Sequence, residues 1–143
     1  MMSGRLAELA EGDHIVTKTV ALDRESLVRY AGASGDFNPI HYRDDVAKSV
    51  GLDGVLAHGM LTMGLAIGPL AEWLDGAGHI TSYQVRFTKP VYVPSNGCIE
   101  VTVAASVSQR DVPETGQVTV ALTVTIGDGV TVLGKAFAVV SPA

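Results

Sequence analysis

The segment GVLAHGMLTMGLAIGPLA, residues 54–71, contains no Asp, Glu, Lys or Arg, and it predicts one long apolar helix over about residues 59–74. A run of this length and a GxxxG motif also fit a membrane-spanning helix. His58 near its start, Pro69 near its end and the acidic EWLDG that follows favour a buried core helix instead. The prediction is therefore a core helix and no insertion into a membrane.

Four segments with alternating apolar and polar residues follow this helix, and they predict strands. They are ITSYQVRFTKPVYV, CIEVTVAASVSQ, QVTVALTVTI and GVTVLGKAFAVV, with turn-forming residues between them at 94–97, 113–116 and 127–129. HIVTKTVAL, residues 14–22, predicts one more strand before the helix. Because the later connections are short, neighbouring strands are expected to pair in antiparallel fashion.

One apolar helix and one antiparallel sheet predict an α+β fold in which five strands wrap around a long central helix. We expect residues 1–143 to form a single domain. Gly64 and Gly68 are expected to let the helix approach the sheet closely. A single sheet cannot cover the whole helix, so we expect a second copy or a related chain to cover the remainder.

Two shorter helices are predicted between the first strand and the long helix. The first begins after Asp23, a plausible N-cap, and ends near Gly35. The second covers about residues 44–52, with Asp44 or Asp45 as its cap.

The composition excludes several classes of function. The 143 residues are 47% hydrophobic and carry a net charge of −5 without a Lys/Arg run, which argues against nucleic acids and anionic membrane surfaces. Cys98 is the single cysteine, so an intramolecular disulfide is excluded and a zinc site is disfavoured. MMSGRLAELAEGDH, at the start, lacks the apolar core of a signal peptide, so the expected location is cytoplasmic.

The side chains best suited to catalysis lie close together in the segment SGDFNPIHYRDD, residues 34–45. Asp36 and His41 are a carboxylate and an imidazole five residues apart, and such a pair can transfer protons to and from one water molecule. Asn38 and Pro39 restrict the backbone between them. The residues alone fit either this acid–base pair or a polar turn that ends one helix and starts another.

A second candidate lies where the long helix begins. Gly59 has no side chain to block its amide, and the first amides of a helix lack intrahelical partners. Such an amide can stabilise an oxyanion. Gly59 also fits a role as a simple turn residue. We expect His58 to shape the site by orienting this loop.

YAGASGDFNPIHYRDDVA, residues 30–47, resembles the hydratase-2 signature of MaoC-like (R)-specific hydratases and dehydratases. AHGMLTMG and VRFTKPVYVP resemble further segments of the same family. The resemblance extends over about residues 12–140, and within the family it is strongest to the catalytic subunits of heterodimeric (3R)-hydroxyacyl-carrier-protein dehydratases of fatty acid elongation.

The resemblance implies a hotdog fold paired with a second hotdog, as a homodimer or heterodimer. It implies hydration and dehydration of acyl thioesters carried on coenzyme A or an acyl carrier protein. Asp36 and His41 would be catalytic, the Gly59 amide would be the oxyanion donor, and no metal or other cofactor would take part. Two alternatives remain open: a non-catalytic hotdog partner that binds acyl thioesters, and a hotdog thioesterase. The acyl chain length and the physiological direction are not indicated.

Overall fold

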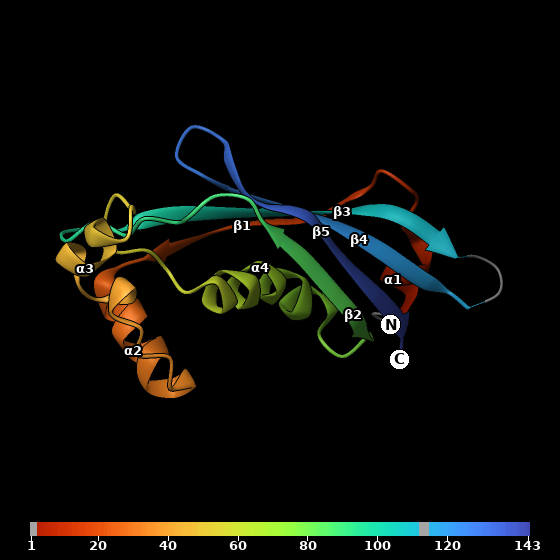
Figure 1. The fold of residues 1–143 in the computed structure, drawn as a ribbon. Coiled ribbons are helices and arrows are strands. Elements are labelled where there is room, and N and C mark those ends of the chain that lie inside the picture. The colour runs from red at the N-terminus through yellow and green to blue at the C-terminus, as the bar shows by residue number, and fades with distance from the viewer. Residues whose placement is uncertain (1–2, 112–114) are drawn as a thin grey trace.

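The long apolar helix lies at the centre of the fold. In the computed structural model, which describes residues 3–111 and 115–143, α4 (Gly59–Leu74) lies against one face of a curved sheet (Figure 1). Its bounds agree with the predicted helix. The sheet-facing side is apolar except for Thr62, and its buried residues are Thr62, Ala66, Pro69, Leu70 and Leu74. No helix in the described ranges has the length and apolar character needed to cross a membrane.

The sheet has five strands, and every neighbouring pair is antiparallel. The strands are β1 (His14–Leu22), β2 (Gly78–Phe87), β3 (Ile99–Asp111), β4 (Gln117–Ile126) and β5 (Val130–Pro142), in the spatial order β1-β3-β4-β5-β2. Strand β2 follows the helix in sequence and forms one edge (Figure 1). The predicted hotdog arrangement, a five-stranded antiparallel sheet around a helix, is confirmed. Residues 113 and 114 of one predicted turn lie outside the described residues.

Alternation of side chains along the strands places the core between the sheet and α4. In β4, Val118, Val120, Leu122 and Val124 are all buried, while the residues between them are partly or fully exposed. This is the period of two expected for a sheet with one covered face.

Four short elements complete the fold: α1 (Ser3–Glu8), α2 (Arg24–Ser34), the 3-10 turn η1 (Pro39–His41) and α3 (Asp44–Ser49). The predicted start and end of α2 are confirmed. The Asp23 carboxylate accepts a hydrogen bond from the Ser26 amide at 2.9 Å, and Gly35 ends the helix with a φ of 78°. Helix α1 was not predicted.

The predicted capping of α3 by Asp44 or Asp45 is wrong. The N-cap of α3 is Arg43, which makes no side-chain capping bond. Asp44 lies in the first turn, where its carboxylate accepts hydrogen bonds from the Val55 amide at 3.0 Å and from Arg24. Asp44 therefore ties α3 to the loop that leads into α4.

The prediction that Gly64 and Gly68 permit close packing against the sheet is also wrong. A Cβ atom added to either glycine would meet no atom within 4 Å. Both line an open groove of about 600 Å³ between α4 and β1. Met60, on the same side of the helix, is 62% exposed. One side of α4 is thus left uncovered by the sheet, in agreement with the expectation that a single sheet covers only part of the helix.

Candidate active site

Two successive Asx-type hydrogen bonds shape the loop that carries Asp36. After Gly35 ends α2, the Asp36 side chain accepts a bond from the Asn38 amide, and the Asn38 side chain accepts one from the Ile40 amide, each at 3.2 Å. Pro39 occupies the first position of η1, where its missing N–H is tolerated. The segment 36–41 is therefore a defined turn that leads directly into His41.

His41 is 8% exposed, and its Nδ1 atom lies 2.7 Å from the carbonyl oxygen of Leu56. A carbonyl oxygen can only accept, so in the neutral ring Nδ1 carries the proton and Nε2 carries the lone pair. The Leu56 carbonyl is itself held in place. Its neighbours bond to the segment 91–93, through Ala57 N to Val91 O at 2.8 Å and Val93 N to Val55 O at 3.0 Å. The Nε2 atom of neutral His41 is thus the one that can accept a hydrogen bond.

His58, the N-cap residue of α4, is 1% exposed and stacks on His41. The two ring centroids are 3.8 Å apart and the planes differ by 20°. The Tyr30 ring meets His58 edge-on at 4.7 Å. His58 Nε2 lies 3.1 Å from the carbonyl oxygen of Asp36, to which it donates. Burial lowers the pKa of His58, which favours the neutral ring.

Asp36 and the two histidines converge on one point. One ligand-type atom from each of Asp36, His41 and His58 lies within 4.8 Å of the others. Two groups at that separation can both bond one water molecule, since each hydrogen bond spans about 2.8 Å. Among the described residues, the same three form a group that could hold a metal ion, because carboxylate and imidazole are common ligands. The expectation of a metal-free site stays a prediction.

Gly59 is the first residue of α4, and the first amides of a helix have no intrahelical acceptor. A Cβ atom added at Gly59 would lie 3.2 Å from the Phe87 ring, so a side chain here would crowd that ring. His41, Gly59 and Phe87 line one cavity of about 320 Å³, whose buried wall includes Val132 and Leu133. The imidazole and the Gly59 backbone therefore face the same space.

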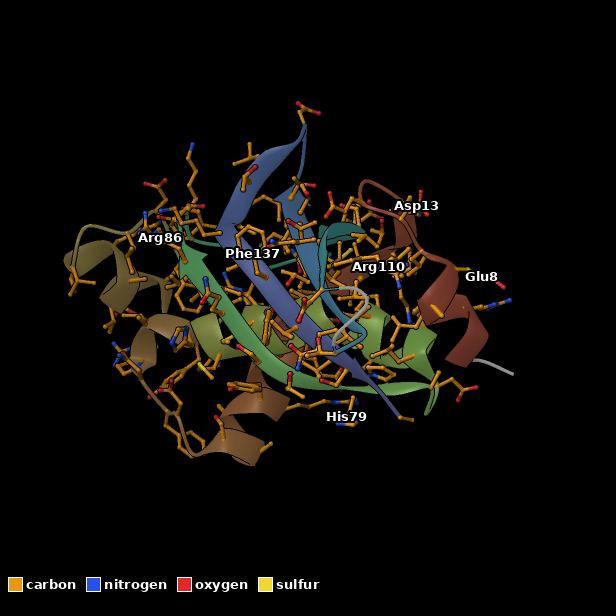
Figure 2. All side chains as sticks on the ribbon, turned by 90° about the vertical axis from the view of Figure 1, so that its right-hand side faces the viewer. Glu8, Asp13, His79, Arg86, Arg110 and Phe137 are labelled. Carbon is orange, nitrogen blue, oxygen red and sulfur yellow. The ribbon has the colours of Figure 1, made fainter. Side chains whose placement is uncertain are left out.

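The cavity lies at the end of β2 that carries Phe87. Figure 2 shows His79 and Arg86, which mark the two ends of this strand, far apart along it. His79 and His14 are exposed. Asp36 is exposed and does not line the cavity.

The structure brings together all six residues that the sequence singled out: Asp36, Asn38, Pro39, His41, His58 and Gly59. It adds Tyr30, Phe87 and the Leu56 carbonyl, to which sequence reasoning assigned no such contact. Tyr30 is the first residue of the segment 30–47 that resembles the hydratase-2 signature, and Phe87 is the last residue of β2. A main-chain carbonyl such as that of Leu56 has no signal in the sequence.

Comparison with known proteins places this geometry in context. The family model described as "MaoC like domain" matches residues 7–127. An (R)-specific enoyl-CoA hydratase of Rhodospirillum rubrum is 31% identical over 122 residues, which are 85% of this chain and 80% of that protein. 3-Hydroxyacyl-thioester dehydratase X of Mycobacterium tuberculosis is 38% identical over 73 residues, 51% of this chain.

The chain spans only part of some of these proteins. The match covers 25% of dehydratase X. A solved structure titled "MaoC-like dehydratase" superposes with a TM-score of 0.88 at 34% identity, over 96% of this chain and 42% of that one. The family match therefore covers residues 7–127, and the fold is shared over 96% of this chain.

Proposed function

Since this chain belongs to the family of MaoC-like domains, we propose that it interconverts (3R)-hydroxyacyl and trans-2-enoyl thioesters by adding or removing water. The names of the Rhodospirillum rubrum and Mycobacterium tuberculosis relatives support this activity. The single observation that carries the proposal is the convergence of Asp36 and His41 to within 4.8 Å, beside the exposed start of α4.

In hydration, Asp36 and His41 hold one water molecule over the β-carbon of the enoyl group. His41 Nε2, whose lone pair is left free by the bond from Nδ1 to Leu56, takes a proton as the water oxygen attacks. A proton is then delivered to the α-carbon from the same face, by His41 or with the help of Asp36. Dehydration is the reverse. Because both groups act from one side, addition and removal are syn.

In both directions of the reaction, the thioester carbonyl takes up the electron pair that develops at the α-carbon. The amide of Gly59, at the positive end of α4, donates to the oxygen of that carbonyl as it gains enolate character. This makes the α-proton more acidic without a metal, nicotinamide or flavin. The proposed substrate is an acyl chain on coenzyme A or an acyl carrier protein, whose thioester makes this chemistry accessible.

We further propose that a second hotdog domain, identical or related, completes the site. Strand β2 is an edge of the sheet, and its Phe87 end borders the cavity of His41 and Gly59. An edge strand offers unpaired main-chain groups to another strand. The uncovered side of α4, with Met60 and Gly64, lies open as well. A partner along β2 and α4 would cover both features.

The test is a hydration assay with trans-2-enoyl thioesters of increasing chain length. With wild-type protein, the absorbance of the enoyl group should decrease as hydration proceeds. The rate of this decrease should be about 10²–10⁴-fold lower in Asp36→Asn and His41→Gln. Wild-type turnover in both variants would contradict the proposed mechanism. Thiol release without a 3-hydroxyacyl product would indicate a thioesterase. No reaction with any chain length, alone or with a related hotdog subunit, would favour a binding module.

A further inference from the structure

His58 is linked to all three groups of the proposed chemistry: His41, Asp36 and Gly59. Its ring stacks on His41 at 3.8 Å, its Nε2 donates to the main chain of Asp36, and Gly59 follows it in the chain. Its own carbonyl accepts the Thr62 amide at 3.1 Å, the first hydrogen bond inside α4. Its side chain bonds to the Asp36 backbone and not to the Asp36 carboxylate, of which Oδ1 accepts the Asn38 amide and Oδ2 has no protein hydrogen bond among the described residues.

We propose that His58 is a positioning residue that aligns the base His41, the carboxylate Asp36 and the Gly59 amide without touching the substrate. This inference rests on the proposed function of Asp36 and His41. The ring of His58 covers one face of the His41 imidazole, and the Leu56 carbonyl holds its edge. One restraint on the face and one on the edge leave the His41 ring little freedom to tilt or flip.

The hydrogen bond from His58 to the Asp36 carbonyl restrains Asp36, the second of the two proposed catalytic residues. Asp36 is exposed, and the side-chain hydrogen bonds of its loop, which involve Ser34, Asp36 and Asn38, all join residues two positions apart. The hydrogen bond from His58 Nε2 to the Asp36 carbonyl links that loop to the buried N-cap residue of α4. The distance between carboxylate and imidazole is therefore restrained through this buried ring as well as through the turn 36–41. Small displacements of reacting groups cost large factors in rate, which is why such a link matters.

The unpaired nitrogen of His58 argues that the residue is there for more than packing. In the part of the chain that the structure describes, Nδ1 of His58 is buried and has no hydrogen-bond partner. Burying such a nitrogen is unfavourable, and phenylalanine would fill the same space without it. Only a flat ring with a donor at the Nε2 position meets both requirements, stacking on His41 and donating to Asp36. Histidine meets both requirements, but its Nδ1 atom is then left without a hydrogen-bond partner.

Two substitutions separate these two contacts. His58→Phe keeps a ring against His41 and removes the donor, whereas His58→Gln keeps a donor near the Nε2 position and removes the ring. We expect each to lower kcat about 10-fold, and His58→Ala to lower it on the order of 10²-fold. KM should change little, because His58 does not contact substrate. His14→Phe, which alters an exposed histidine on β1, is the matched control and should leave kcat unchanged.

A purely structural role predicts a different result, in which stability falls but the folded fraction keeps wild-type kcat. Wild-type kcat in folded His58→Phe and His58→Gln would overturn the proposal. Where a variant does not fold, ¹⁵N spectra of histidine-labelled wild-type protein decide the matter. They should show His58 as the neutral Nε2–H tautomer, and the Nδ1–H tautomer would overturn the proposal. Because these spectra need no turnover, they test His58 even if the hydratase activity itself proves absent.

Discussion

The Nδ1 atom of His41 lies 2.7 Å from the carbonyl oxygen of Leu56, and this contact determines which nitrogen of the ring carries the lone pair. The tautomer of His41 is therefore determined by a main-chain group fifteen positions further along the chain. The position of the Leu56 carbonyl depends on the loop 53–57, which is held by hydrogen bonds to the segment 91–93 and to Asp44.

Asp44→Asn should weaken this loop and lower both the melting temperature and kcat, the latter roughly tenfold. Asparagine can accept the Val55 amide but loses the charge that pairs with Arg24. Circular dichroism melting and the hydration assay measure the two effects. Asp45→Asn, which removes an exposed pair with Arg43, is the matched control and should change neither. Equal effects from the two variants would contradict the role given to Asp44.

The stability supplied by Asp44 should depend on pH. The bond from the Val55 amide, followed by the bond from Arg24, lowers the pKa of Asp44 below its usual 3.8. The carboxylate is therefore more favourable in the folded state, so its contribution is present above the usual pKa and is lost as the pH falls through the lowered pKa. Melting curves should show the difference between wild type and Asp44→Asn narrowing as the pH falls through that range.

Gly59→Pro should abolish the proposed oxyanion donor while preserving the helix. Proline is well accepted at the first position of a helix, and His58 before it has φ −58° and ψ 134°, a conformation that proline permits. Removing the amide proton is expected to lower kcat about 10²–10³-fold. Gly59→Ala keeps the amide and adds the same Cβ atom 3.2 Å from Phe87, whose ring is 53% exposed and can move. If the alanine variant lost as much activity as the proline variant, crowding and not the amide would be responsible.

Tyr83→Phe should destabilise the contact between β2 and α4. The Tyr83 hydroxyl donates to the Met63 carbonyl at 2.7 Å, and removing such a bond costs about 1 kcal/mol. Chemical denaturation measures this loss. Activity of the folded protein should stay near wild type, since neither residue lines the cavity of His41 and Gly59.

Burial raises the pKa of Tyr83 from 10.0 to about 12. The neutral hydroxyl is thus favoured in the folded state. Its contribution is fully present below pH 10 and is lost as the pH rises through about 12. Wild type should lose stability more steeply than Tyr83→Phe across this interval. Parallel curves for the two proteins would contradict the buried position of the hydroxyl.

The larger elements of the fold follow from periodicity that is visible in the chain. The apolar run at 59–74 and the alternation in residues such as 117–126 correspond to α4 and β4 without adjustment. The two errors concern residues whose surroundings depend on parts of the chain distant in sequence. Asp44 has the residue type of a cap, but Val55 and Arg24 offer better hydrogen bonds. Gly64 faces open space, which depends on how far the sheet curls.

In the candidate site, the residues and their chemical character could be predicted from the sequence, but several of their contacts could not. The residue types and spacing of Asp36 and His41 indicate acid–base chemistry, and Gly59 at a helix start indicates a free amide. The stacking of His58 on His41 and the bond to Leu56 could not be predicted. Both depend on the path by which residues 53–58 return to η1, and short-range patterns carry no information about that path.

The stereochemical course of hydration in D₂O tests the central claim most directly, namely that Asp36 and His41 act on one water from one face. A trans-2-enoyl thioester should give a (3R)-hydroxyacyl product with one deuterium at C2, added on the same face as the oxygen. Nuclear magnetic resonance of the product, with chiral chromatography, reads both centres. A (3S) product, deuterium on the opposite face, or no hydration at all would contradict the account.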